Sequence, residues 1–325
     1  MASDTITTKR KGDLAKLFQG TVELEGSCEG EAGLLDLRRT CIKNPKHDGF
    51  ISVKDFNRSH LPLKYQHDEV FELTKVLAEL TVRLAVQYIS PDRPDFYAET
   101  DTPYPFASRK GTNFLQTGSG RVRRVMIFYE KDEEVCPCSE CKDSESPVVE
   151  FGEIVVYTAT HVVFDDVEAR QTTVRFGFDD EDNVGVDLEG VYVMGNDKVN
   201  DICHLHCVSH DLDFLQKLYD TCLKCDGLSY NVLIRYDDTM FHDKLTLLVS
   251  HPHGCFKQIS IGEWTDKDSE SYPMTRYAYT APTCPGSSGA FLFVLGREPY
   301  YYAYDHVHSG SNSITNFSSF GDESL

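Results

Sequence analysis

The stretch GEIVVYTATHVV, from Gly152 to Val163, decides the fold. Its first part is rich in β-branched and aromatic residues, which is typical of a β-strand. A polar imidazole, His161, stands at the end of that strand. A single histidine in such a place usually has a structural role, but it becomes a candidate general base if the fold brings a nucleophile beside it.

Runs of the same kind follow one another from about residue 111 to the C-terminus. Glycine or aspartate joins them at short spacing, which favours an antiparallel all-β barrel or sandwich over a parallel sheet. The runs are RRVMIFYEK, TTVRFGF, GVYVMG, SYNVLIRY, KLTLLVS, KQISIGEW, TRYAYTA, GAFLFVLG and YYAYDHV.

The first third of the chain has a different texture. Residues 1–62 mix charge, glycine and short apolar islands, and we expect a partly disordered N-terminal extension. From Asp68 to Tyr88 apolar residues return every three or four positions, which predicts one amphipathic helix. A proline-rich connection then leads to a β domain at 111–325. The helix could pack on the barrel, inhibit it or mediate dimerisation.

Composition excludes several classes of function. The 325 residues include 52 acidic and 32 basic ones, a net charge of −20, which disfavours binding to nucleic acid. The sequence has no apolar run of membrane-spanning length and no signal-like N-terminus, so we expect no membrane contact and a cytoplasmic location. The oligomeric state stays open.

A serine pair lies between two predicted strands, in Thr283-Cys284-Pro285-Gly286-Ser287-Ser288-Gly289-Ala290. The flanking glycines allow a tight turn that exposes the hydroxyl of Ser288. In such a turn the N–H groups of Gly286 and Ser288 could form an oxyanion hole. A plain Gly/Ser hairpin is the alternative.

A carboxylate that orients His161 completes a candidate triad. Asp211 stands just before an apolar alternation in SHDLDFL, as a buried orienting acid would. Asp213 competes for this role, because it lies one strand period further on.

Four motifs in this order resemble the trypsin-like serine proteases. TATHVV is similar to their TxAHVV segment, DLDFL to D-[IL]-x-[LF]-L and GSSGA to G-x-S-G-[GSA]. Gly118-Ser119-Gly120-Arg121-Val122 resembles a strand of the high-temperature-requirement and glutamyl-endopeptidase branches. The resemblance implies two perpendicular six-stranded antiparallel β-barrels, chymotrypsin-like, after an N-terminal helical extension. The segments VSHPHGC and TCPGSSGA also resemble uncharacterised molluscan and other invertebrate proteins.

Departures from that family bear on regulation and specificity. Ser287 replaces the aspartate that pairs with a new N-terminus in secreted relatives, so activity should not depend on N-terminal processing. His308, in DHVHSG, matches a histidine that holds Glu or Gln before the scissile bond, which implies cleavage after these residues. Thr280 and Pro282 should form the wall and base of the pocket. The base lacks the aspartate of a trypsin.

The eleven cysteines of a chain without a signal peptide are expected to be reduced thiols. The alternative is one structural zinc, shared by the CPCSEC group of Cys136, Cys138 and Cys141 and the pair Cys222 and Cys225. No other cofactor is expected.

These features predict a serine endopeptidase with protein or peptide substrates. Ser288 would attack, His161 would carry the proton and Asp211 would orient the histidine. The alternative is a catalytically silent module of the same fold that binds peptides or partners. A zinc hydrolase is disfavoured because no H-E-x-x-H pattern occurs.

Overall fold

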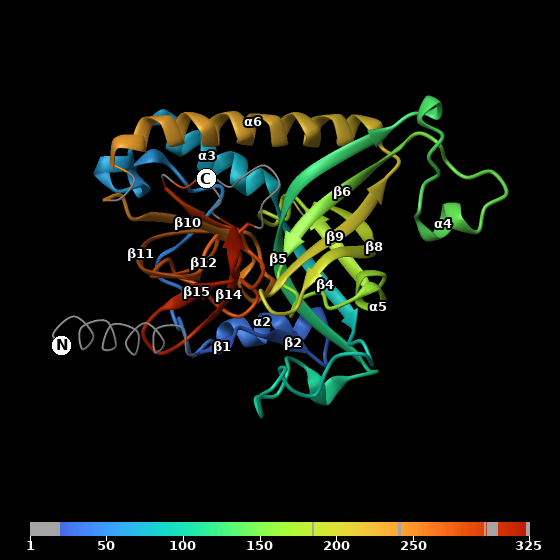
Figure 1. Cartoon of the computed structure of the whole chain (residues 1–325), viewed down its shortest axis with the longest axis horizontal. Helices are drawn as coiled ribbons and strands as arrows, with labels where there is room; N and C mark the ends of the chain where they lie inside the picture. The colour runs from blue at the N-terminus through green and yellow to red at the C-terminus, as the bar shows by residue number, and fades with distance from the viewer. Residues whose placement is uncertain (1–19, 184, 240–241, 296, 298–304, 323–325) are drawn as a thin grey trace.

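The computed structural model describes residues 20–322, apart from 184, 240–241, 296 and 298–304. The chain is mostly β, as expected, and its two sheets contain only antiparallel strand pairs (Figure 1). Of the predicted N-terminal extension, residues 1–19 lie outside the described part. Residues 20–62 form short strands, turns and one α-helix, and the strands extend both sheets.

Six strands of the first sheet close into a ring, because β5 pairs with both β4 and β6. The ring runs β5-β4-β7-β8-β9-β6, and β2 extends it at β5. The strands are β2 (Glu25–Ser27), β4 (Thr81–Tyr88), β5 (Asn113–Phe128), β6 (Phe151–Thr158), β7 (Thr172–Phe176), β8 (Val186–Asp197) and β9 (Ile202–Ser209).

The second sheet runs β1-β14-β15-β12-β11-β10-β13, with β16 on β12 and β3 on β11. Among the described residues, the first sheet contains seven strands and the second nine, rather than six each. Short strands, mostly from the N-terminal segment, extend both sheets. The right-angle crossing stays a prediction. The strands are β1 (Thr21–Val22), β3 (Phe50–Ser52), β10 (Leu245–Ser250), β11 (Gln258–Ser271), β12 (Met274–Tyr279), β13 (Leu292–Val294), β14 (His308–Ser311), β15 (Asn316–Ser318) and β16 (Gly321–Asp322).

Two long helices, α3 and α6, pack side by side over both sheets (Figure 1). The described helices are α2 (Glu31–Arg39), α3 (Asp68–Leu80), α4 (Ser139–Lys142), α5 (Asp166–Ala169) and α6 (Leu212–Tyr236), with 3₁₀ turns at Arg58–His60, Leu63–Tyr65, Ala107–Arg109, Glu130–Asp132, Asp237–Thr239 and Pro252–Gly254. Among the described residues, no helix is both long and apolar enough to cross a bilayer.

The predicted helix at Asp68–Tyr88 is half correct. It ends at Leu80, and residues 81–88 form β4, which lies between β5 and β7 in the ring. Residues 81–86 are all buried, because the strand is covered on both faces. A strand buried in this way has no alternation, so its pattern resembles that of a buried helix. β4 thus lies in the barrel although it precedes the predicted boundary at residue 111.

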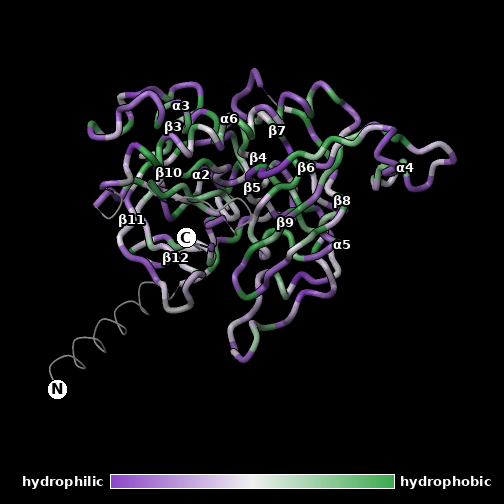
Figure 2. The backbone as a smooth tube through the Cα atoms, turned by 45° about the horizontal axis from the view of Figure 1, so that its top comes forward, coloured by the Kyte–Doolittle hydropathy of each residue, from purple (hydrophilic) through white to green (hydrophobic). Residues whose placement is uncertain are grey.

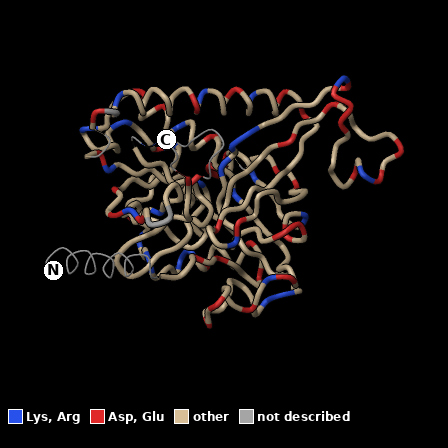
Figure 3. The backbone as a smooth tube through the Cα atoms, in the orientation of Figure 1, with Lys and Arg blue, Asp and Glu red and all other residues tan. Residues whose placement is uncertain are grey.

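The predicted strand SYNVLIRY is wrong, since these residues end the 25-residue helix α6. The buried residues of α6 recur at helical intervals of three, four and seven. They face α3 and β5 and join the main core, which extends over both sheets. Hydrophobic stretches run through the sheets in Figure 2, whereas charged residues mark α6 and the hairpin that carries α4 in Figure 3.

Candidate active site

His161 is paired with Asp201. Its Nδ1 lies 2.8 Å from Oδ2 and 3.0 Å from Oδ1 of Asp201, and its backbone N–H donates to Oδ1 at 3.0 Å. The hydroxyl of Ser309 donates to Oδ2 of the same carboxylate at 2.6 Å. Asp201 therefore fixes both the ring and the backbone of His161.

The assignment of Asp211 as the orienting acid is wrong in this structure. Asp211 caps α6, where its Oδ1 accepts from the N–H of Phe214 at 3.0 Å and its carbonyl accepts from Leu215. Asp213 lies in the first turn of the same helix. The physical reason is that DLDFL begins a helix, whereas Asp201 immediately precedes the true strand β9.

The local electrostatics keep Asp201 ionised. Burial alone would raise the pKa of Asp201, but His161 and the hydrogen bonds from His161 and Ser309 hold it below its ordinary value. A carboxylate in this state accepts a hydrogen bond from the Nδ1–H of the imidazole.

The turn that carries His161 is held from two sides. Thr160 Oγ1 donates to the carbonyl of Ile202 at 2.7 Å, and Arg93 Nη2 donates to the carbonyl of His161 at 3.0 Å. Nε2 of His161 is buried and has no hydrogen-bond partner among the described residues. One ring nitrogen of His161 is thus available for a further hydrogen bond.

Ser288 lies in the turn between β12 and β13, packed against the strand that leads to His161. A Cβ at Gly289 would lie 2.1 Å from Thr158 Oγ1, and the φ of Gly289 is +84°, so only glycine fits there. The side chains of Ser288 and His161 are 1% and 2% exposed. Among the described residues, no hydrogen bond joins them.

Two backbone donors of this turn are unused. The N–H groups of Gly286 and Ser288 have no hydrogen-bond partner among the described residues. The carbonyl of Pro285 accepts from His253 N–H at 2.6 Å, which fixes the Pro285–Gly286 peptide with its N–H on the opposite side. Both N–H groups are therefore available as hydrogen-bond donors.

The hydroxyl of Ser288 contacts a carbonyl group of this same chain. The Ser288 hydroxyl donates a 2.6 Å hydrogen bond to the backbone oxygen of Glu23. Strand β1, just before Glu23, pairs antiparallel with β14, and the Glu23 N–H donates to Ser309 at 3.2 Å. This is how an extended peptide adds to a sheet edge.

The Glu23 side chain is held in a buried polar pocket. Its Oε2 lies 3.1 Å from His308 Nε2, and its Oε1 accepts from Ser311 Oγ at 2.6 Å and pairs with Lys43. Thr283 Oγ1 lies 3.4 Å from Oε1. Glu23 itself is 7% exposed. The pocket thus surrounds a carboxylate with hydrogen-bond donors and one cation.

Tyr279 sets the tautomer of His308. Burial raises the pKa of Tyr279 well above its ordinary value and lowers that of His308 well below. The Tyr279 hydroxyl therefore keeps its proton and donates it to Nδ1 of a neutral His308, at 2.5 Å. The remaining ring proton sits on Nε2, which faces the Glu23 carboxylate.

The other two expected pocket residues lie elsewhere. Thr280 is exposed and exchanges hydrogen bonds with the backbone of Glu263, and Pro282 faces Gly49. Neither takes part in a hydrogen bond or ion pair to Glu23 among the described residues. Thr283, Ser311 and Lys43 hold its carboxylate instead, because the turn before Ser288 brings Thr283 inward.

No protein-family model and no curated protein matches the sequence. Solved structures that align with this chain include the HtrA-type protease AlgW with a decapeptide, at 13% identity and a TM-score of 0.39, over 76% of this chain and 62% of AlgW. Deg5 aligns at 12% identity and a TM-score of 0.40, over 80% of this chain and 90% of its own. The active form of the Rv3671c protease from M. tuberculosis aligns at 13% identity and a TM-score of 0.37, over 80% of this chain and 82% of its own.

AlgW is an HtrA-type protease, and Rv3671c is a protease. Likenesses this distant establish neither the activity nor the substrate of this chain. The resemblance to molluscan proteins stays a prediction.

The cysteines gather differently from the predicted zinc site. Cys136, Cys138 and Cys141 meet His210, not the pair on α6. Cys222 and Cys225 are buried on α6, where Cys225 Sγ accepts from Arg121 at 3.5 Å. A second group brings together Cys41, His47, His253 and Cys284. None of the eleven cysteines forms a disulfide.

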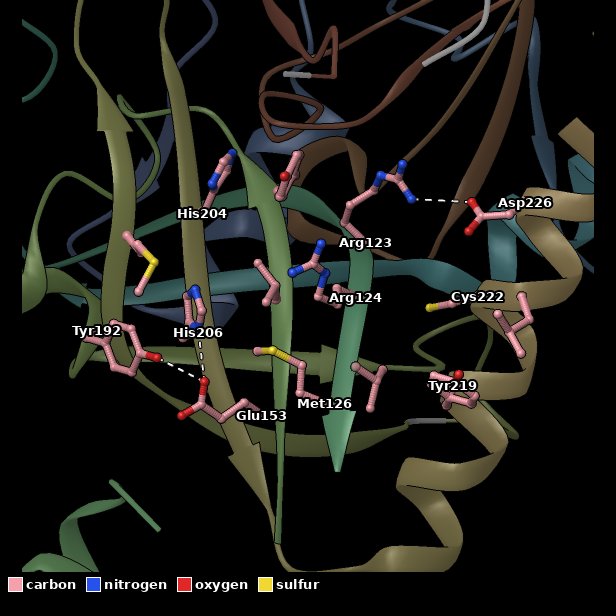
Figure 4. A pocket seen from close by; sticks show the side chains of 15 residues that line it. Arg123, Arg124, Met126, Glu153, Tyr192, His204, His206, Tyr219, Cys222 and Asp226 are labelled. Atoms are coloured by element: carbon pink, nitrogen blue, oxygen red, sulfur yellow. Dashed lines mark hydrogen bonds and ion pairs between the residues drawn. The ribbon is translucent and has the colours of Figure 1, made fainter. Parts of the chain in front are cut away.

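A separate pocket of about 490 Å³ lies between α6 and the first sheet (Figure 4). In it Glu153 Oε2 accepts from Tyr192 at 2.9 Å and lies 3.3 Å from His206 Nδ1, while Arg123 pairs with Asp226. Its lining includes neither Ser288 nor His161. We therefore place the candidate chemistry at Ser288, not here.

Proposed function

We propose that this chain is a serine endopeptidase that cleaves peptide bonds after glutamate. One observation carries the proposal: the Ser288 hydroxyl contacts the carbonyl of a glutamate whose side chain fills a donor-rich pocket. In support, His161 is oriented by Asp201, and its Nε2 has no hydrogen-bond partner among the described residues.

The proposed mechanism is acyl transfer. Ser288 Oγ attacks the carbonyl carbon, and His161 Nε2 takes its proton and returns it to the leaving amine. Asp201 holds the imidazole tautomer, and the N–H groups of Gly286 and Ser288 are the candidate oxyanion donors. Because Ser288 donates to Glu23 in this structure, its hydroxyl must first turn toward Nε2.

The pocket favours glutamate over glutamine. Ser311 and the Nε2–H of His308 are donors, and Lys43 is a cation. A glutamine amide would place an NH₂ group where the Glu23 carboxylate now accepts hydrogen bonds, and it would lose the ion pair with Lys43. We expect a preference of about tenfold to a hundredfold.

The test is hydrolysis of peptides that differ only in the residue before the scissile bond: Glu, Gln, Lys or Leu. The Glu23→Ala chain is assayed beside the wild type, because Glu23 fills the pocket. We expect cleavage after Glu, and a loss of roughly a thousandfold or more in Ser288→Ala. Cleavage chiefly after Lys or Leu would refute the specificity. Hydrolysis that survives Ser288→Ala would refute the mechanism.

A further inference from the structure

The N-terminal segment lies in the active site as a substrate would. Thr21 and Val22 pair with Ser311 and Gly310, the Glu23 side chain fills the pocket, and the Glu23 carbonyl contacts the nucleophile. Backbone pairing, side-chain recognition and carbonyl position thus agree on one register. That register places the bond between Glu23 and Leu24 next to Ser288.

We propose that the protein cleaves its own Glu23–Leu24 bond intramolecularly. This inference rests on the proposed function. Ser288 Oγ bonds to the Glu23 carbonyl carbon as its proton moves to His161 Nε2. The Glu23–Leu24 C–N bond breaks, and the Leu24 nitrogen receives that proton. Water then hydrolyses the ester, which gives a Glu23 carboxylate and regenerates the Ser288 hydroxyl.

The two sides of this bond are anchored differently. After it, β2 pairs with β5, and the carboxylate of Glu25 contacts Nδ1 of the buried His253. Before the bond, the described contacts are the pairing of β1 with β14 and the side-chain contacts of Glu23. Cleavage would therefore leave residue 24 onward in place and let the shorter piece depart from the cleft.

This mechanism differs from zymogen activation by a new amine, which the sequence disfavours. In self-cleavage, processing instead removes the segment that occupies the site of Ser288. The expectation that activity needs no N-terminal processing would then be wrong, because the site must be cleared and not because a new amine is needed. The amphipathic helix α3 is not the inhibitory element, because its apolar face is buried in the core with α6.

The test follows the purified full chain by intact mass and N-terminal sequencing. We expect the wild type to begin at Leu-Glu-Gly-Ser with a half-time independent of protein concentration, and Ser288→Ala to stay intact. Glu23→Ala should be cleaved at least about tenfold more slowly, since it loses its charge-assisted contacts. Glu29→Gln, at an exposed site, is the matched control and should behave as wild type.

The outcomes separate the two proposals. If the wild type stays intact while Glu23→Ala hydrolyses an added glutamyl peptide through Ser288, self-cleavage is refuted and the proposed function stands. If neither chain cleaves anything, the proposed function fails. If processed wild type cleaves the Ser288→Ala chain as fast as itself, the reaction is intermolecular and the intramolecular claim fails.

Independently, two groups of cysteine and histidine are arranged as metal ligands. The hairpin cluster is Cys136, Cys138, Cys141 and His210, and the N-terminal cluster is Cys41, His47, His253 and Cys284. In each, four ligand atoms from different side chains lie within 4.8 Å of one another. We infer that each cluster binds one zinc ion.

The hairpin cluster has tetrahedral spacing. Its three sulfurs lie 3.1, 3.8 and 3.7 Å from His210 Nε2. Tetrahedral zinc with ordinary bond lengths separates sulfur from nitrogen by about 3.6 Å. Backbone N–H groups of Cys138, Cys141 and Val148 also point at the sulfurs, as suits thiolates.

The N-terminal cluster has two histidine nitrogens that need a partner. Nε2 of His47 and Nε2 of His253 are buried and unpartnered among the described residues. Nδ1 of His253 contacts Glu25, the carboxylate–histidine pattern that orients metal ligands. The two sulfurs lie 3.6 Å apart. A zinc ion here would tie the N-terminal segment to the turn that carries Ser288.

Zinc content of the purified full chain tests both sites. We expect two zinc ions per wild-type chain, one in Cys138→Ser and one in Cys41→Ser, and two in Cys28→Ser, whose exposed thiol belongs to neither cluster. Cobalt substitution gives a second readout, since each variant should lose its own thiolate absorption. Wild type without zinc refutes both sites. A single zinc that only one variant removes refutes the other site.

Discussion

Nδ1 of His161 lies 2.8 Å from the carboxylate of Asp201, and Asp211 caps a helix instead. Asp201→Asn should lower kcat by about 10³–10⁴-fold, because an amide imposes the wrong imidazole tautomer. Asp211→Asn should change activity and stability little, since asparagine caps a helix as well as aspartate does. Peptide hydrolysis by the two variants decides between the acids. Equal losses would contradict the pairing.

Tyr279 is predicted to act on specificity through His308. Tyr279→Phe removes the hydroxyl that donates to Nδ1, so His308 no longer has one enforced tautomer facing the substrate carboxylate. We expect kcat/KM for glutamyl peptides to fall about tenfold, with little change for leucyl peptides. Tyr192→Phe, in the pocket of Figure 4, is the control. A uniform loss on all peptides would show a structural effect only.

A buried ion pair supports the turn of His161. Arg93 binds Glu168 through Nε at 2.6 Å and Nη2 at 2.7 Å, and both side chains are fully buried. Glu168→Gln leaves a buried guanidinium without its counter-charge, so the free energy of unfolding should fall by about 3–5 kcal/mol. Chemical denaturation measures this change.

The control is the exposed pair Lys110–Asp95. Asp95→Asn should cost at most about 1 kcal/mol. If both variants lose the same small amount of stability, the buried pair does not have the predicted role.

Local patterns were sufficient for the β content, whereas the roles of His161, Ser288 and His308 stay predictions. Local patterns were insufficient where two structures share one pattern: β4 is buried on both faces and resembles helix, and DLDFL fits a strand motif but begins α6. The same pattern of an acid before apolar residues occurs at Asp201-Ile202-Cys203-His204-Leu205, which leads into strand β9. The helical periodicity of α6 was the signal that could have favoured Asp201 over Asp211 as the orienting acid.

Glu23 and His210 left no local signal. Both matter only through residues far away in the chain, since Glu23 meets Ser288 and His210 meets the CPCSEC group. Spacing within a sequence predicts neighbours along a helix or strand, but not which distant segment fills a site.

The cytoplasmic location stays a prediction.

The most direct test of the central claim is covalent labelling by a fluorophosphonate, which reacts with an activated serine. Mass spectrometry of the wild-type and Glu23→Ala chains should find one phosphonyl group, on the peptide that contains Ser288. Ser288→Ala should carry none, and Asp201→Asn should react much more slowly. If wild type and Glu23→Ala both stay unlabelled, Ser288 is not an activated nucleophile, and the protein is instead a catalytically silent module.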